Sequence, residues 1–410
     1  MLNEPSPPIL DRRAFLQLCS ALPFVQPRDL ARLVPAGDDR VLLVLELVGG
    51  NDGLNTVIPV DDARYAAARP TLAAVRRGAH ALGDGTALHP ALGRLHRRVQ
   101  DGQGAVLHGC GYPAPDRSHF RSRDIWHTAA PLLPRVDART TGWLGRAAEQ
   151  LAAATAGPPA VAVGGLEVPL LLRSERVAAP SVRRVEDFQW LSPATAAPIE
   201  AAAPVRRLVD GSGTRGGAVR DFVAATAQQA AALADQLTQA LRGYRPRADH
   251  PATALGRDLQ LAAQLTVAGF GTRLVHASLG GFDTHARQLA THAALLAQLD
   301  AALDAFLQDV AAHGAGDRLV VLVHSEFGRR VAENASQGTD HGAAAPVLVF
   351  GAVRGGVHGP VPDLQRLDDG DLVATTDFRC VYADLLQWLG VDAAAVLGGA
   401  FAPAGVAAPR

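Results

Sequence analysis

The sequence predicts an α/β protein, a doubly wound three-layer sandwich built around a mostly parallel sheet. The segment Arg40–Pro59 begins with a near-continuous apolar run, typical of a strand that is buried on both faces of a parallel sheet. Later in the chain, strand-like and helix-like segments alternate, as they do in a doubly wound fold. With 410 residues, 48% of them hydrophobic, the chain is long enough for one large domain or two smaller ones.

The first half of the chain supplies two strands and a helix in this scheme. Arg40–Pro59 reads as a strand that runs into a Gly-rich turn, and residues 102–113 read as a second strand followed by a loop. The segment Ser118–Ala129 predicts a helix, and Ser118 is a suitable N-cap.

The pattern changes between Leu151 and Asp249. Two short strands, 160–165 and 169–174, precede a Gly-rich loop and an Ala-rich helix near Asp221–Leu241. This stretch is interpreted as an inserted cap or as an edge of the sheet, within a single domain spanning 39–410.

Strand–loop–helix alternation then resumes and continues almost to the end of the chain. Three helices are expected, together with three strands and the loops that follow two of them: helices Thr253–Ala268, Leu289–His313 and Asp377–Gly390, strands 272–279, 318–325 and 345–351, and loops 280–288 and 326–330.

Residues 1–38 resemble an export signal. Arg12 and Arg13 stand directly before a short apolar run, a pattern typical of twin-arginine signals. The expected location is therefore periplasmic or extracellular, with the twin-arginine machinery as a partner. The alternative is an amphipathic segment docked on the domain of a cytoplasmic protein. The chain contains no run of eighteen apolar residues, so no transmembrane helix is expected.

Charge and cysteine content exclude some classes of function. The net charge is -1 and the pI is near 6.9, which gives no electrostatic case for binding nucleic acid. The cysteines, Cys19, Cys110 and Cys380, have no metal-type spacing, and their number rules out a disulfide scaffold.

Polar residues follow, or directly precede, the apolar strands. They are Asn51, Asp52, Ser118, His119, Asp283, His285, Glu326, Asp340 and His341. Ligands of open α/β sheets bind at the carboxyl ends of the strands, so these residues are expected to converge at one edge. Carboxylates and imidazoles together suit one or two divalent ions. A serine at a helix N-terminus beside them favours an anion such as phosphate or sulfate.

Each of these residues also has a simpler structural interpretation. Asp52 fits a turn, Ser118 fits a helix cap, and Asp283 could cap a helix while His285 lies on the surface. Glu326 could form an ion pair with Arg329 or Arg330. His341 could be a core histidine.

Several blocks resemble a known family. The blocks are "LVGGNDGLNTVIP", "GYPAPDRSHFRSRDIW", "GWLGR", "GGFDTH", "HSEFGRRVAENASQGTDHGAAAPVLVFG" and "TTDFR". They resemble a bacterial exported family catalogued as domain-of-unknown-function family 1501, over about Val41 to Gly390. By the order of its motifs, that family in turn resembles the alkaline phosphatase and sulfatase superfamily.

The resemblance implies roles for most of the convergent residues. Phe327 stands where the superfamily has a metal-binding histidine, so His119 is placed in the catalytic set and could complete the site. The nucleophile is implied to be Ser118, with Ser122 a poorer match. The cofactor is implied to be one or two divalent ions, zinc first, with manganese, magnesium or calcium as alternatives. The implied metal ligands are Asp52, Asp283, His285, Glu326 and His341.

The function implied is hydrolysis of a phosphate or sulfate ester, of a small molecule or a polymer. Arginines could clamp the non-bridging oxygens, and the expected substrate-binding residues are Asn51, Arg117 and Arg329, with Arg121 as a further candidate. Two alternatives stay open: a non-catalytic exported protein serving surface assembly or polymer binding, and a metal-dependent phosphotransferase or mutase.

Overall fold

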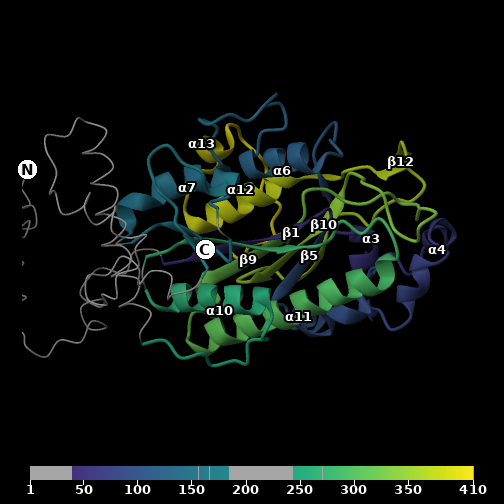
Figure 1. The fold of residues 1–410 in the computed structure, drawn as a ribbon, viewed down its shortest axis with the longest axis horizontal. Helices are drawn as coiled ribbons and strands as arrows, with labels where there is room; N and C mark the ends of the chain where they lie inside the picture. Colours follow the sequence, from purple (N-terminus) through teal and green to yellow (C-terminus); the bar gives the residue numbers. More distant parts are fainter. Residues whose placement is uncertain (1–38, 156, 166, 184–242, 270, 410) are drawn as a thin grey trace, which may run out of the picture. The chain divides into compact units, whose positions relative to one another are not determined.

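A mostly parallel sheet lies between two layers of helices (Figure 1). The computed structural model describes residues 39–409 except 156, 166, 184–242 and 270. In this part, nine strands form the main sheet in the order β11-β5-β10-β9-β1-β8-β6-β7, and β14 also pairs with β5. The α/β sandwich predicted from the sequence is therefore confirmed.

The centre of the sheet is parallel. Strand β1 pairs in parallel with β8 on one side and β9 on the other, whereas β10 runs antiparallel to both β9 and β5. The strands are β1 Val41–Val48, β5 Gly104–Gly111, β6 Ala160–Val163, β7 Ser181–Val182, β8 Leu274–Gly280, β9 Leu319–His324, β10 Ala345–Gly351, β11 Gly356–His358 and β14 Thr376–Asp377. Because β10 is antiparallel, the residues that enter it lie at the same edge as the carboxyl ends of β1, β8 and β9.

Helices cover both faces of the sheet. The two faces bury separate apolar clusters, one containing leucines of α10 and α11 and the other containing residues of α6, α7 and α12 (Figure 1). The helices are α5 Gly93–Gln100, α6 His119–Thr128, α7 Trp143–Leu151, α10 Ala254–Val267, α11 Gln288–Ala312, α12 Phe378–Leu389 and α13 Ala393–Leu397. Helices α6, α10, α11 and α12 confirm the predicted helices to within a few residues.

Smaller elements pack beside the carboxyl edge. They are the short helices α3 Gly53–Thr56 and α4 Ala63–Ala68, the sheet of β2 Val57–Ile58, β3 His80–Ala81 and β4 Ala87–Leu88, and the pair β12 Leu367–Asp368 with β13 Asp371–Leu372. Leu54, Tyr65 and Leu372 belong to a third apolar cluster that joins these elements.

One predicted strand is wrong. Residues 169–174 form the 3₁₀ helix η4, Leu170–Leu172, with Pro169 at its N-cap. Pro169 fixes the backbone angle φ at the start of the turn, and Leu171 and Leu172 are buried against helices instead of pairing with a strand. The predicted helix 221–241 and the predicted export signal 1–38 lie outside the described residues.

No helix in the described ranges has the length and apolar character needed to cross a membrane.

Candidate active site

Three histidines converge on one carboxylate at the carboxyl edge of the sheet. Asp283 and His285 lie in the loop after β8, His341 lies in the loop before β10, and His119 is the first residue of α6. The Asp283 Oδ1 atom lies 3.0 Å from His285 Nε2, 3.1 Å from His341 Nε2 and 3.4 Å from His119 Nε2. Sequence reasoning grouped these four residues, and the structure brings them together.

The other nitrogen of each ring is held by a hydrogen-bond acceptor. His119 Nδ1 lies 2.8 Å from Glu326 Oε1, and His341 Nδ1 lies 2.8 Å from the carbonyl oxygen of Arg117. His285 Nδ1 lies 3.2 Å from Asp340 Oδ1. Because these partners only accept, each Nδ1 carries the proton in the neutral ring, so each Nε2 presents a lone pair towards Asp283.

This arrangement fits a divalent cation. The ligand atoms of His119, Asp283 and His341 all lie within 4.8 Å of one another. A tetrahedral zinc ion with bonds of about 2.0–2.2 Å holds its ligand atoms about 3.4 Å apart, close to the spacings around Asp283. His119 Nε2 is also buried without a hydrogen-bond partner, and the Nε2 atoms of His285 and His341 face each other at 2.9 Å. A cation would satisfy all of these lone pairs.

Electrostatics favour the metal-binding protonation states. Burial raises the pKa of Asp283, but hydrogen bonds from Arg329 and His341 outweigh it and hold that pKa at about 2. Burial lowers the pKa of His341, and the neighbouring Asp283 opposes this only in part. At neutral pH the centre therefore offers an ionised carboxylate and, at His341, a neutral imidazole.

Glu326 serves the centre through His119. Its buried carboxylate accepts hydrogen bonds from the Gly49 backbone at 2.9 and 3.2 Å and from Ser325 Oγ at 3.0 Å, besides its contact with His119. Glu326 was expected to be a metal ligand, yet its oxygens are directed at groups that position a ligand. A carboxylate behind a metal-binding histidine fixes the tautomer and the orientation of the ring.

The structure does not bring Asp52 into this cluster. The Asp52 side chain is fully buried and pairs with the equally buried Arg69, with Nη1 and Oδ2 2.6 Å apart. Its carboxylate also accepts from Gln288 Nε2 and from the backbone N–H of Asn55, where it caps α3. The expected metal ligand is therefore the centre of a separate buried ion-pair network.

The expected substrate-binding residues are held by protein groups. Arg329 is buried and donates to the carbonyl oxygens of Gly50 and Thr339 and to Asp283. Asn51 is bonded to Thr56, and its Oδ1 accepts from His292. A further expected residue, Arg117, pairs with Asp369 and Asp371 at 3.0 and 2.7 Å, and Arg121 donates to the Pro131 carbonyl oxygen.

The two candidate nucleophiles differ in environment. Ser118 is exposed at the N-cap of α6, and its side chain makes no capping hydrogen bond. Ser122 is buried, and its hydroxyl bonds the Glu326 carbonyl oxygen and Tyr112. Of the two hydroxyls, that of Ser118 is the accessible one.

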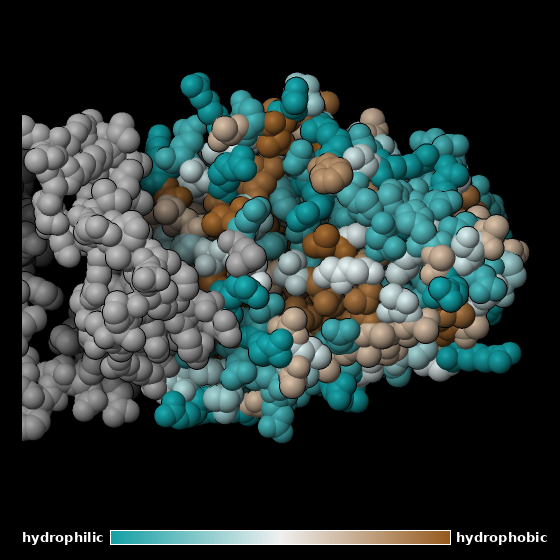
Figure 2. Space-filling view, viewed as in Figure 1, coloured by the Kyte–Doolittle hydropathy of each residue, from teal (hydrophilic) through white to brown (hydrophobic). Residues whose placement is uncertain are grey.

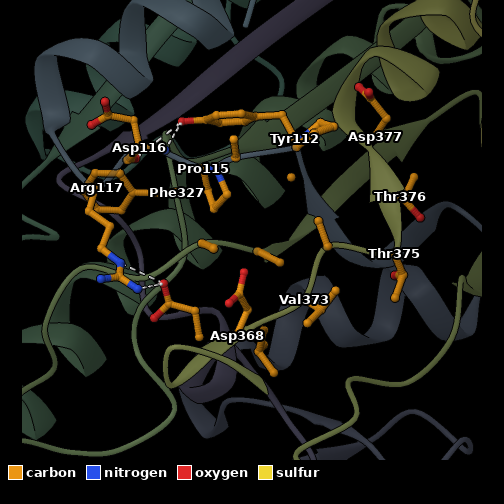
Figure 3. Close-up of a pocket in the computed structure, with 18 of the residues that line it drawn as sticks. Tyr112, Pro115, Asp116, Arg117, Phe327, Asp368, Val373, Thr375, Thr376 and Asp377 are labelled. Atoms are coloured by element: carbon orange, nitrogen blue, oxygen red, sulfur yellow. Dashed lines mark hydrogen bonds and ion pairs between the residues drawn. The ribbon is translucent and has the colours of Figure 1, made fainter. Parts of the chain in front are cut away.

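A cavity of ≈ 810 Å³ borders the cluster (Figure 3). Phe327 lines it, and the same ring packs against His119 and His341 with centroids 4.9 and 4.8 Å apart. A side chain at Gly50 would place its Cβ 2.1 Å from the Phe327 ring, so this position requires glycine. Phe327 therefore forms the wall between the imidazoles and the cavity.

The family of the chain follows from its whole length. Residues 39–402 match the family described as "Protein of unknown function (DUF1501)". The chain belongs to this family. No curated protein matches the DUF1501 chain.

Some solved structures resemble the DUF1501 chain. One is a protein in the alkaline phosphatase superfamily from Vibrio parahaemolyticus, at 11% identity over 88% of this chain and 69% of that one, with a TM-score of 0.41. Another is the PsFucS1 sulfatase from Pseudoalteromonas sp., at 10% identity over 90% and 74% of the two chains, with a TM-score of 0.41. A third is the phosphonate monoester hydrolase of Agrobacterium radiobacter, at 10% identity over 88% and 78%, with a TM-score of 0.38.

Sequence reasoning missed two residues that shape the site of this DUF1501 protein. Arg69 neutralises Asp52, and Gln288 connects Asp52 with Thr284 and Thr339. An arginine inside the apolar stretch "ARYAAARP" was the available signal for Arg69, because a buried arginine needs a carboxylate partner. Gln288 gave no signal, since it only begins α11.

Proposed function

We propose that this protein is a metal-dependent hydrolase of a phosphate or sulfate ester. The observation that carries the proposal is the convergence of His119, His285 and His341 on Asp283, with every Nδ1 held by an acceptor. Imidazole nitrogens and a carboxylate at tetrahedral spacing suit zinc, and manganese or another divalent ion is an alternative.

His119, Asp283 and His341 would hold the ion, and His285 lies beside them as an additional ligand or as a base. A divalent cation at this point supplies Lewis-acid stabilisation of the charge that develops on the ester oxygens. Glu326 keeps the His119 ring oriented, and the carbonyl oxygen of Arg117 does the same for His341. These contacts hold the donor atoms in place before any ligand arrives.

Ser118 is the proposed nucleophile. It is exposed, it begins α6, and its neighbours in the chain, Arg117 and His119, both contact the cluster. The helix N-terminus favours negative charge on its oxygen and on the ester. Ser118 Oγ would bond to phosphorus or sulfur as the bond to the alcohol breaks, and water would then release the acid from the serine.

The decisive test combines metal content with turnover. Wild-type protein should contain stoichiometric metal and hydrolyse an aryl phosphate or an aryl sulfate. Asp283→Asn and His341→Gln should lose both, whereas His358→Gln, an exposed histidine bonded to the carbonyl oxygen of Arg354, should keep both. Metal-loaded wild-type protein that turns over neither ester would overturn the proposal.

A non-catalytic exported protein is the second candidate. It is favoured by the engagement of Arg117 and Arg329 with protein carboxylates and carbonyl oxygens, which leaves their guanidinium groups committed. Under this reading the metal would stabilise the loops at the sheet edge, and metal removal would lower the melting temperature without any loss of turnover to observe.

Export is a separate part of the proposal. It rests on Arg12 and Arg13 in the sequence. Replacing both by lysine should retain the protein in the cytoplasm, because the export receptor reads the arginine pair. Delivery of the double variant across the membrane at the wild-type level would contradict twin-arginine export.

A further inference from the structure

The cavity beside the cluster is rich in hydrogen-bond acceptors. Two segments enclose most of it, the loop 111–117 after β5 and the stretch 368–377 around β13 and β14 (Figure 3). Its lining contains one basic residue, Arg117, and five aspartates: Asp116, Asp368, Asp369, Asp371 and Asp377. A second phosphate or sulfate would be repelled here, so this space suits the alcohol part of an ester.

One of these aspartates is poised for a ligand. Asp371 is 2% exposed, and its Oδ1 atom has no hydrogen-bond partner among the described residues. Arg117 lies 2.7 Å from Oδ2, while the nearest cation to Oδ1 is Arg330 Nε at 3.6 Å. Burial raises the pKa of Asp371, because the surrounding arginines compensate only part of the lost hydration. A buried carboxylate oxygen in this state gains from a positive partner.

The rest of the lining is compatible with a cationic group. The aromatic rings of Tyr112 and Phe327 both line the cavity, and ring faces attract ammonium groups (Figure 3). In the same view as Figure 1, the surface over β12, on the rim of the cavity, is hydrophilic (Figure 2). The site thus combines acidic charge with aromatic surface.

An inorganic ion does not fit this arrangement. In the described part of the chain, one group of three or more metal-ligating side chains has its atoms within 4.8 Å, and it is the cluster of His119, Asp283 and His341. The aspartates of the cavity surround a volume and do not meet at a point. A larger cation, with its charge spread over carbon-bound nitrogen, matches that geometry.

We propose that the cavity binds the alcohol part of the substrate and selects alcohols that carry an organic ammonium group. The assignment of this group to an ester substrate rests on the proposed hydrolase function. Binding of the ammonium group itself requires neither metal nor turnover.

The test compares choline with its uncharged isostere, in which a carbon atom replaces the nitrogen. Calorimetric titration of the full-length protein should show binding of choline and at least about tenfold weaker binding of the isostere. Asp371→Asn should weaken choline binding by about tenfold. Asp363→Asn, which removes the same charge from an aspartate outside the cavity lining, should leave it unchanged.

A second variant protects the test against misfolding of Asp371→Asn. Arg117→Gln should tighten choline binding, because it frees carboxylate oxygens of Asp369 and Asp371. A purely structural role of the loop predicts the opposite. Equal binding of choline and the isostere, or no binding of either, would overturn the proposal.

The two proposals can fail separately. Hydrolysis of aryl esters without choline binding would remove the ammonium site and leave the hydrolase standing. Choline binding without hydrolysis of any ester would keep the ammonium site and remove its assignment to a leaving alcohol.

Discussion

Glu326 Oε1 lies 2.8 Å from His119 Nδ1, although the two residues are 207 positions apart in the chain. The contact turns an expected metal ligand into the support of another ligand. Glu326→Gln should keep the shape of this group and remove its charge, so the His119 ring loses basicity. We expect metal affinity to fall by about 10–100-fold, measured by competition with a chelator.

The control for that change is Glu333→Gln, which removes the same charge from a residue that binds the backbone N–H groups of Thr71 and Leu72. It should leave metal affinity unchanged. Wild-type affinity in Glu326→Gln would show that the charge of Glu326 does not act on the centre.

Asp52 should matter for stability and not for metal binding. Asp52→Asn leaves the fully buried Arg69 without its carboxylate, which should cost about 3–5 kcal/mol of unfolding free energy. Metal stoichiometry should stay at the wild-type value in the protein that remains folded. Denaturant unfolding and metal analysis of the same sample measure both quantities.

A matched comparison is Asp62→Asn, which disrupts the exposed pair of Asp62 with Arg64 at 3.0 Å. Exposed pairs contribute about 0–1 kcal/mol, and asparagine is also a good N-cap for α4. Metal loss in folded Asp52→Asn would restore Asp52 to the list of ligands.

The two serines at the start of α6 should separate chemistry from stability. Ser118→Ala should abolish ester turnover with little change in melting temperature, because the Ser118 side chain makes no capping bond. Ser122→Ala leaves the Glu326 carbonyl oxygen and Tyr112 without a buried partner and should cost about 1–3 kcal/mol. Retained turnover in Ser118→Ala would exclude that residue as the nucleophile.

Stability should fall below neutral pH because of buried histidines. Burial lowers the pKa of His292 to about 4, only partly opposed by Asp52. The unfolded value is about 6.5, so the unfolded chain binds the proton first as the pH falls. This contribution is complete above about pH 6.5 and is lost between about pH 6.5 and 4, at no more than about 1.4 kcal/mol per pH unit.

The measurement is urea unfolding of wild type and His292→Gln at about pH 8 and about pH 5. Glutamine can still donate to Asn51 Oδ1, and it does not titrate. The difference in stability between the two pH values should be smaller in the variant. An identical pH dependence would show that His292 is not a source of the acid sensitivity.

The sequence predicted the layers of the fold and much of the cluster, and the reasons are local. Apolar runs mark β1, β8, β9 and β10, and each is followed or preceded by the polar residues that the sheet edge gathers. The sequence could not separate Asp283 from Asp52, because both follow a strand. Their difference lies in long-range partners: Arg69 takes up Asp52, while three imidazoles face Asp283.

Local pattern also failed where chain direction or tertiary packing decides. The antiparallel course of β10 is invisible in its composition, yet it brings His341 to the edge. The leucines of 170–172 were expected to extend as a strand, but their apolar surface is buried by helices.

Arg329 joins three loops that the sheet alone would leave independent. Its guanidinium donates to carbonyl oxygens of Gly49 and Gly50 after β1, of Phe282 after β8 and of Thr339 before β10. Loops usually open by local fluctuation far below the cost of global unfolding. These three share one buried cation, so none can open without breaking the hydrogen bonds of the others. Their amide protons, including that of Gly49 bonded to Glu326, should exchange with solvent at rates closer to those of β1 than of a surface turn.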